Sequence, residues 1–382
     1  MSILLVVGGL LALIVGAELM VRGASGIAAA LGISPLIVGL TVVAFGTSAP
    51  ELAVAVTAGA TGNAAVTLGN VVGSNVFNVL AILGISALIA PLAVSHQLVR
   101  LDVPVMIAAS LAALAVAADG SIGLMDGIIL LAAFAVYTVV LILIARRQAR
   151  TRADLDRLRD AGGTPNAADG VAPDDNPAAR PRPRWLINLL MVAVGLGLLV
   201  AGSQWLVRGA ADIATALGMS EFVIGVVIVA TGTSMPELVT SVVAGLRGNR
   251  DIAVGNVVGS NIFNALIVLG GGAVAAGAAG GGGAAAAGLP GLTVEPAVLR
   301  FDMIVMVVVA LGCLPIFFTG FRIDRWEGGL FLAYYAAYLA YLLGVATRGL
   351  TIGLAFAAPL TLVTVAVIAV GQLRRRGRRG RA

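Results

Sequence analysis

One stretch of the chain occurs twice, and this duplication constrains the fold more than any other feature. Residues 16–84 align without a gap with residues 202–270. Each copy carries the motif Gly-Thr-Ser-x-Pro-Glu, at 46–51 and at 232–237, and then a second motif, Gly-Ser-Asn-x-x-Asn. Both motifs interrupt segments that are otherwise apolar. Polar motifs repeated in two apolar halves are typical of membrane transporters built from internal repeats.

The composition is that of an integral membrane protein. Hydrophobic residues make up 59% of the 382 residues and charged residues only 11%, a balance not found in ordinary soluble domains. The apolar runs are continuous rather than alternating, which excludes a closed β-barrel and predicts an all-α fold. All 24 basic residues are Arg, and the net charge of +5 indicates where the cytoplasmic loops lie rather than nucleic-acid binding.

The apolar segments predict five spans in each half, since a span needs about 20 residues. In the first half, residues 1–145, the spans are expected at 2–20, 35–61, 66–90, 103–118 and 123–145. In the second half, residues 185–346, they are expected at 185–207, 221–246, 252–274, 301–319 and 327–346. Because five is odd, the two halves insert with opposite orientation, and the predicted fold is a ten-helix inverted-repeat (5+5) core.

The other segments complete the predicted organisation. Residues 146–184 are rich in Arg, Asp and Pro, and they predict a polar linker because such a composition buries too little apolar surface to order itself. Residues 350–372 predict an eleventh transmembrane helix, followed by a basic tail at 373–382. The motif-bearing regions are 35–84 and 221–270.

Three local features receive structural interpretations. The run 2–20 is expected to be a retained first helix rather than a signal peptide, because no basic residue precedes it and its counterpart lies in the middle of the chain. Cys313, the single cysteine, cannot form an internal disulfide and is expected to be a small core residue. The Gly/Ala-rich insertion at 271–291 is of low complexity; an extension of the eighth helix and a flexible loop are both open for it, and it indicates no chemistry.

The distribution of Arg predicts the orientation in the lipid bilayer. If the linker is cytoplasmic, the N-terminus lies outside and the C-terminal tail is cytoplasmic. The short inside loops then carry more Arg than the outside loops, as the positive-inside rule requires. The inside residues are Arg22, Arg100, Arg247, Arg250, Arg322 and Arg325, and the outside ones are Arg208, Arg300 and Arg348. We expect a multi-pass protein of the cell (plasma or inner) membrane, while its protein partners are unknown.

Only three acids lie well inside apolar segments, and they are Glu18, Glu51 and Glu237. A charge at the bilayer centre costs at least about 2.5 kcal/mol, so it needs a partner or a purpose. No Arg lies deep enough in a span to neutralise Glu51 or Glu237. Brought together at a pseudo-two-fold axis, these two carboxylates predict a site for an external cation or for protons. Glu18 corresponds to Gln204, so the repeat does not support it as a ligand.

The residues around the two acids predict a site made of oxygen donors. Pro50 and Pro236 should break their helices and free backbone carbonyls. Ser74 and Asn78 are four residues apart and share a helix face, and the second half repeats this spacing. Hard oxygen donors without Cys or His suit Na⁺ or Ca²⁺ rather than Zn²⁺ or copper. The candidate ligands are Glu51, Glu237, Thr47, Ser48, Ser74, Asn78, Thr233, Ser234, Ser260, Asn264 and the carbonyls of Ala44 and Ala230.

Some of these polar positions also have a structural interpretation. A Thr-Ser pair in a membrane helix often bonds back to its own backbone. Asn75 and Asn261 fall on a different face from the candidate ligands, so ion contact and helix packing are both open for them. A small-xxx-small spacing, which predicts close helix packing, is formed by Gly69, Gly73, Gly255 and Gly259.

The two duplicated motifs resemble those of the cation/calcium exchanger superfamily, the sodium/calcium antiporters with two α-repeats. The resemblance implies an inverted-repeat core in which Glu51 and Glu237 bind Ca²⁺ and Na⁺ alternately, with the candidate ligands above completing the site. It implies the two ions as substrates and no cofactor. One departure is that some relatives carry Asp where this chain has Asn264. With two carboxylates, a third bound Na⁺ would lack full charge compensation.

Three functions are compared on these residues. A Na⁺/Ca²⁺ antiporter fits the motifs, and a Ca²⁺/H⁺ antiporter using the same carboxylates is the alternative, because buried carboxylates can also carry protons. An intramembrane aspartyl protease would need paired Asp in the middle of the spans, and none lies there. A channel would more naturally use rings of subunits. The sequence therefore predicts a secondary transporter and not an enzyme.

Overall fold

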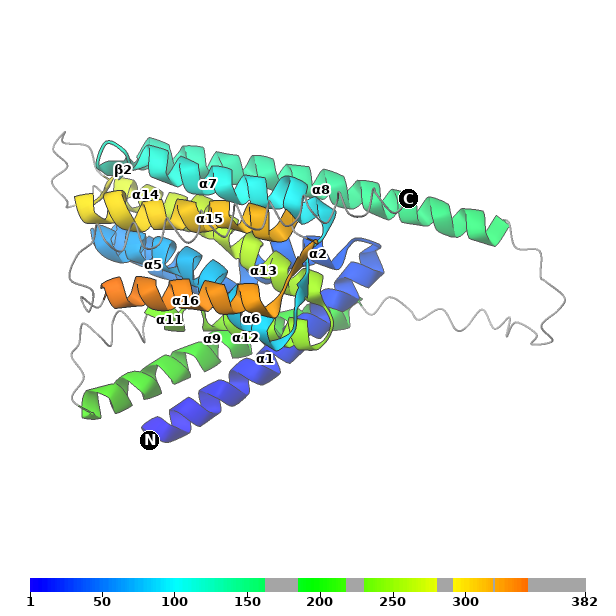
Figure 1. The fold of residues 1–382 in the computed structure, drawn as a ribbon, viewed down its shortest axis with the longest axis horizontal. Coiled ribbons are helices and arrows are strands. Elements are labelled where there is room, and N and C mark those ends of the chain that lie inside the picture. The colour runs from blue at the N-terminus through cyan, green and yellow to red at the C-terminus, as the bar shows by residue number, and fades with distance from the viewer. Residues whose placement is uncertain (162–184, 218–229, 280–290, 319, 343–382) are drawn as a thin grey trace, which may run out of the picture.

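The computed structural model describes residues 1–161, 185–217, 230–279, 291–318 and 320–342. Within them the chain forms a helical bundle that the pair α1 (Ser2–Leu31) and α9 (Trp185–Ala216) crosses obliquely (Figure 1). In this described part, seven helices are long and apolar enough to span a membrane, or eight if a bent pair counts as one span. The predicted segments 350–372 and 373–382 lie outside the described residues.

The two halves contain similar successions of helices, short strands and π-helical turns (η). After α1 the first half contains α2 (Pro35–Val38), η1 (Gly39–Val43), α3 (Ala44–Thr47), α4 (Ala49–Ala60), α5 (Ala64–Phe77), η2 (Asn78–Ile82), α6 (Leu83–Ile89), β1 (Leu92–Ala93), η3 (Leu98–Asp102), α7 (Val103–Val116), β2 (Ser121–Gly123) and α8 (Leu124–Ala161). After α9 the second half contains α11 (Ala230–Gly232), α12 (Met235–Leu246), α13 (Arg250–Phe263), η6 (Asn264–Val268), α14 (Leu269–Ala278), β3 (Gly291–Thr293), η7 (Val298–Asp302), α15 (Met303–Phe318), β4 (Arg322–Ile323) and α16 (Arg325–Leu342).

The segment that carries the first motif is broken at Ser48, as the prolines predict. Ser48 has φ −86° and ψ 7°, and the helical segments 35–47 and 49–60 on either side are bent by 46°. Pro50 has no N–H to continue the helical hydrogen bonding across this point. Ser234, with φ −91° and ψ 10°, precedes α12 in the same way. The breaks place the following Glu in the first turn of a new helix.

Helices α1 and α9 pack closely through glycines. A Cβ built on Gly9 would lie 2.7 Å from the Gly202 carbonyl oxygen, and one built on Gly202 would lie 2.8 Å from the Gly9 carbonyl oxygen. Gly16 and Gly195 are in the same relation, at 2.7 Å in both directions. Numbers rise along α1 as they fall along α9, so the two helices are antiparallel. The contact is reciprocal between the halves: Gly16 aligns with Gly202, and Gly9 and Gly195 each lie seven residues before them.

Two short antiparallel strand pairs connect the halves. Strand β1 pairs with β4, with Leu92 opposite Ile323. Strand β2 pairs with β3, with Ile122 opposite Leu292. Each pair therefore joins one strand from each half.

Among the candidate spans of the described residues, Ala64–Ile89 and Arg250–Ala278, which carry the second motif, have the largest buried shares, 78% and 94%.

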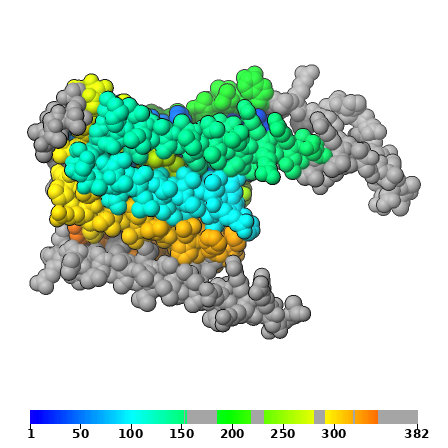
Figure 2. Space-filling view, turned by 90° about the horizontal axis from the view of Figure 1, so that it is seen from above, coloured from blue at the N-terminus to red at the C-terminus, as the bar shows by residue number. Residues whose placement is uncertain are grey.

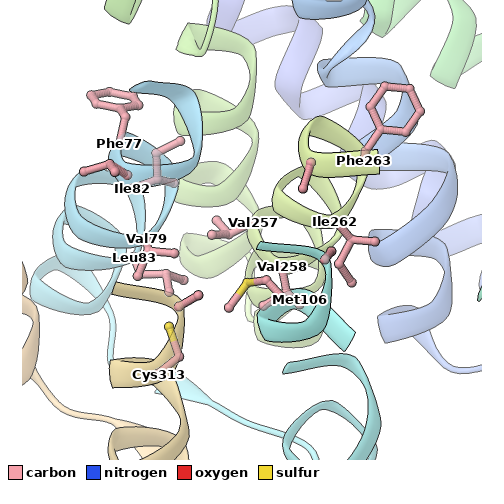
Figure 3. Packing of buried hydrophobic residues seen from close by; sticks show 14 of the residues in the cluster. Phe77, Val79, Ile82, Leu83, Met106, Val257, Val258, Ile262, Phe263 and Cys313 are labelled. Carbon is pink, nitrogen blue, oxygen red and sulfur yellow. The ribbon is translucent and has the colours of Figure 1, made fainter. Parts of the chain in front are cut away.

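Corresponding residues Phe77 and Phe263 lie on opposite sides of the apolar cluster (Figure 3). Cys313 is buried in that cluster, which confirms its prediction as a small core residue. Helices α7 and α8 run side by side over one face of the molecule (Figure 2).

Helix α8 extends beyond its predicted end. The linker was expected to begin at residue 146, but α8 continues to Ala161. Residues 146–161 contain neither Gly nor Pro, whereas Gly162 and Pro165 follow directly. An established helix propagates through such a stretch, because adding residues to it avoids the cost of nucleation. The prediction was wrong for this part because it averaged composition over the whole of 146–184.

Helix α1 also ends later than expected, at Leu31 rather than at residue 20. Arg22 was taken as the end of the apolar run, yet an Arg does not interrupt a helix. The terminating residue is Gly32, whose φ of 66° gives the left-handed cap that glycine adopts most easily.

Candidate cation site

The two acids of the repeated motif lie at the centre of the bundle, and each is bonded to the opposite half. Glu51 and Glu237 stand in the first turns of α4 and α12, and both are fully buried. Ser48 Oγ donates to Glu237 Oε1 at 2.9 Å, and Ser234 Oγ donates to Glu51 Oε1 at 3.0 Å. The two copies of the motif therefore face each other, as the sequence predicts.

The second oxygen of each carboxylate is buried without a hydrogen-bond partner among the described residues. Within the described residues, Glu51 Oε2 and Glu237 Oε2 are buried and accept no hydrogen bond. A buried polar atom left unpaired is costly, and a buried charge more so. Among the candidate ligands the same is true of Asn78 Oδ1, Ser260 Oγ and the Asn264 side-chain oxygen and nitrogen. Such a concentration of unpaired oxygens is what a cation-binding centre requires.

The second motif brings α5 and α13 against these acids. Ser74 Oγ lies 3.1 Å from Ser234 Oγ. Since the single Ser234 proton is directed to Glu51, Ser74 is the donor in that contact. Asn78 and Asn264 begin the π-helical turns η2 and η6. A π-helical turn is wider than an α-helical turn, so it changes the direction in which the following side chains point. Such turns are frequent at functional sites.

Asn75 and Asn261 tie the two central helices together. Asn75 Nδ2 donates to the Asn261 carbonyl and Asn261 Nδ2 donates to the Asn75 carbonyl, both at 3.3 Å. Asn261 Oδ1 also accepts the Asn78 amide at 3.0 Å. The sequence left ion contact and helix packing open for Asn75 and Asn261. Because both amide nitrogens bond the opposite helix, they support the packing role.

One predicted detail of the first motif is wrong. The Ala44 carbonyl was expected to be freed from the helix, but it accepts the Ser48 N–H at 3.0 Å. Pro50 instead removes the donor for the residue four positions earlier, Gly46. In the second half the equivalent carbonyl, that of Gly232, accepts the hydroxyl of Ser203 at 2.5 Å. Ala44 can still contribute the second lone pair of its oxygen.

The remaining candidate ligands fall around the same breaks. Thr47 Oγ1 donates to Asn256 Oδ1 at 3.1 Å and lies 3.4 Å from the Ala44 oxygen. Ala230 is the first residue of α11, and Thr233 lies between α11 and α12.

Two further asparagines position the acids, and the sequence interpretation missed them. Asn70 Nδ2 donates to the Glu51 carbonyl at 3.0 Å, and Asn256 Nδ2 donates to the Glu237 carbonyl at 3.3 Å. Both bonds join the start of a motif helix to the next helix. The signal was present, because Asn70 and Asn256 occupy the same position in the two repeats.

Glu18 does not belong to the site. It forms ion pairs with Arg22 and with Arg247, whose Nε lies 2.9 Å from Glu18 Oε2. Among the ion pairs of the described residues, none includes Glu51 or Glu237.

Close helix packing was predicted for Gly69, Gly73, Gly255 and Gly259, and the structure confirms it for the two glycines of the second half. A Cβ built on Gly255 would lie 3.0 Å from the Leu36 carbonyl oxygen, and one built on Gly259 would lie 2.7 Å from the Leu40 carbonyl oxygen. Both distances show close packing. For Gly69 and Gly73 no described residue lies within 4 Å of a built Cβ. The residues that correspond to Leu36 and Leu40, at 222 and 226, lie outside the described part of the chain.

Comparison with known proteins agrees with this arrangement. The sequence model of the family described as sodium/calcium exchanger protein matches residues 1–143 and 187–344. CaxA of Alkalimonas amylolytica is 38% identical over 270 residues, covering 69% of this chain and 77% of that protein. The sodium/calcium exchanger MaX1 of Methanosarcina acetivorans is 29% identical over 371 residues, covering 89% and 98%. The solved structure of the sodium-calcium exchanger NCX_Mj, soaked with zero Na⁺ and Ca²⁺, superimposes with a TM-score of 0.68 at 29% identity, covering 89% of this chain and 98% of that one.

A bundle of apolar helices with two buried acids at its centre defines a multi-pass membrane protein of the cation-transporter class. More narrowly, the chain belongs to the sodium/calcium exchanger protein family. This is a family of membrane exchangers and not of enzymes.

Proposed function

We propose that the chain is a secondary active antiporter that exchanges Na⁺ for Ca²⁺ by alternating access, with Glu51 and Glu237 binding the ions near the membrane midplane. The observation that carries this proposal is the crossed pair of buried carboxylates. Each uses one oxygen for a serine of the opposite half and has its other oxygen unpaired.

Charge balance supports an obligatory exchange. Two carboxylates carry two negative charges, which one Ca²⁺ or two Na⁺ would neutralise. The empty site would keep both charges in a region of low dielectric, where unpaired charges are expensive. A loaded site can therefore change its accessibility at lower cost than an empty one, and this difference couples the two ions.

The proposed ligands are oxygen atoms throughout. Ca²⁺ takes six to eight oxygens in a flexible arrangement, and neutral hydroxyl and amide oxygens complete what two carboxylates begin. We assign this role to Thr47, Ser48, Ser74, Asn78, Thr233, Ser234, Ser260, Asn264 and the carbonyls of Ala44 and Ala230.

The two halves are inferred to form an inverted repeat of five spans each, with an eleventh span at 350–372. The antiparallel, reciprocal contact of α1 with α9 and the crossed serine–glutamate bonds support a pseudo-two-fold relation. We further propose that the N-terminus lies outside the cell membrane and that the segment after α8 and the tail at 373–382 are cytoplasmic, because this orientation satisfies the positive-inside rule.

Equilibrium binding tests the proposal. Calorimetric Ca²⁺ titrations of the purified protein at several Na⁺ concentrations and at fixed pH should show Ca²⁺ affinity falling as Na⁺ rises, because both ions need the same two carboxylates. Ca²⁺ affinity that ignores Na⁺ but changes steeply with pH would favour the Ca²⁺/H⁺ antiporter instead. The unpaired carboxylate oxygens could accept protons equally well.

A further inference from the structure

The outward face of α8 changes from apolar to basic along a single stripe. Val136, Val139 and Leu143 are 65%, 54% and 58% exposed, and Arg146 and Arg150 continue the same three-and-four-residue spacing. Both Arg side chains are exposed. The stripe therefore faces hydrocarbon up to Leu143 and meets the polar boundary of the membrane one turn later.

A hollow of about 390 Å³ lies on this turn of the helix. Its lining combines three guanidinium groups with one hydroxyl, one acid and an apolar rim, contributed by Leu143, Arg146, Arg147, Arg150, Thr151 and Asp154. Within the described residues, none of the three Arg forms an ion pair. Adjacent guanidinium groups fit the oxygens of a phosphate, which each can bind through two parallel hydrogen bonds.

The position of the hollow indicates a lipid as the source of that phosphate. Helix α8 runs on past the end of α7, which lies beside it (Figure 1). Arg146, Arg147 and Arg150 are all exposed on this helix. Leu143, on the hydrocarbon side of the hollow, would contact an acyl chain while the Arg side chains hold the head group. Basic groups at this level attract anionic lipids.

On the opposite side of the same turn, α8 is hydrogen-bonded to the start of α2, which leads along the chain to the central site. Gln148 Oε1 accepts the Ser34 N–H at 3.1 Å, and Gln148 Nε2 donates to Gln97 Oε1 at 3.2 Å. Ser34 is the cap of α2, which leads through η1 and α3 to the break before Glu51. A head group that fixes this turn of α8 would therefore also fix the start of the motif segment.

We propose that Arg146, Arg147 and Arg150 form a binding site for the phosphate of an anionic membrane lipid, which stabilises the contact between α8 and α2. The site is separate from the cation site and does not depend on the ions that the protein exchanges.

Melting temperatures test this proposal with the full chain in phosphatidylcholine nanodiscs that contain increasing fractions of phosphatidylglycerol. Wild type should melt at higher temperature as phosphatidylglycerol rises. The fraction needed for half of this effect should increase about tenfold or more in Arg146→Gln/Arg150→Gln, because two phosphate contacts are lost. Arg100→Gln/Arg300→Gln is the matched control, since it removes two exposed Arg elsewhere in the described chain and should keep the wild-type response.

Two further arms make each outcome decisive. Arg146→Lys/Arg150→Lys keeps both charges but loses the paired hydrogen bonds of the guanidinium groups, so it should restore part of the lipid response. Inorganic phosphate added to discs of pure phosphatidylcholine should have no effect. An equal lipid response in the α8 variant and the control, no lipid response in wild type, or full stabilisation by inorganic phosphate alone would each overturn the lipid site.

Discussion

Replacing Glu51 by Gln isolates the contribution of one carboxylate to Ca²⁺ binding. Glutamine has nearly the same shape, and its oxygen can still accept the Ser234 hydroxyl that now bonds Glu51 Oε1 at 3.0 Å. The new amide nitrogen takes the place of Oε2, which has no partner among the described residues. The variant should therefore fold normally while losing one of the two charges at the site.

The expected size of the effect follows from the burial of the site. A pair of unit charges 4 Å apart at an effective dielectric constant of 20 attracts by about 4 kcal/mol, and a divalent ion doubles that figure. Part of the loss is recovered because a neutral amide costs less to bury than a carboxylate. A net loss of about 4 kcal/mol corresponds to roughly a thousandfold weaker Ca²⁺ binding.

Calorimetric Ca²⁺ titration in the absence of Na⁺ measures this change, with the melting temperature as a check on folding. Glu237→Gln should behave in the same way, because its carboxylate has the same crossed bond to Ser48. Ca²⁺ affinity within about threefold of wild type in either variant, less than 1 kcal/mol, would refute the paired-carboxylate site.

The other predictions concern positions outside the two acids. Glu18→Gln should leave Ca²⁺ affinity unchanged in the same titration, because Glu18 is paired with Arg247 outside the site. Gly9→Ala should lower the melting temperature, since its Cβ would lie 2.7 Å from the Gly202 oxygen and overpacking costs about 1–3 kcal/mol, whereas Gly8→Ala, with a Cβ 3.9 Å from its nearest neighbour, should be tolerated. The equilibrium Ca²⁺ gradient held by a fixed Na⁺ gradient should not respond to membrane potential if two Na⁺ exchange for one Ca²⁺, and a tenfold change per roughly 60 mV would reveal a third Na⁺.

The repeat made the pairing of the central acids predictable. Glu51 and Glu237 occupy one position in two apolar halves, so any two-fold arrangement that brings one to the axis also brings the other. The periodicity of a helix was enough to group Ser74 with Asn78. Neither inference needed any knowledge of how the helices pack.

What the sequence did not reveal depends on contacts between segments far apart in the chain. The bond from Ser48 to Glu237 crosses between the halves, and no local pattern predicts which serine meets which acid. The Ala44 carbonyl was predicted to be free because it lies two residues before Gly46 in the sequence. In an α-helix, however, the missing N–H of Pro50 leaves the carbonyl of Gly46 without its donor. The length of α8 was missed because an Arg-rich helix that leaves the bundle has the composition of a linker.

Ion flux into proteoliposomes tests the central claim most directly. With Na⁺ loaded inside and ⁴⁵Ca²⁺ outside at equal pH, wild type should accumulate Ca²⁺, and Glu51→Gln should not. An imposed pH gradient with equal Na⁺ on both sides should drive no uptake. Accumulation driven by the pH gradient and indifferent to Na⁺, or unchanged uptake by Glu51→Gln, would contradict Na⁺/Ca²⁺ exchange through the paired carboxylates.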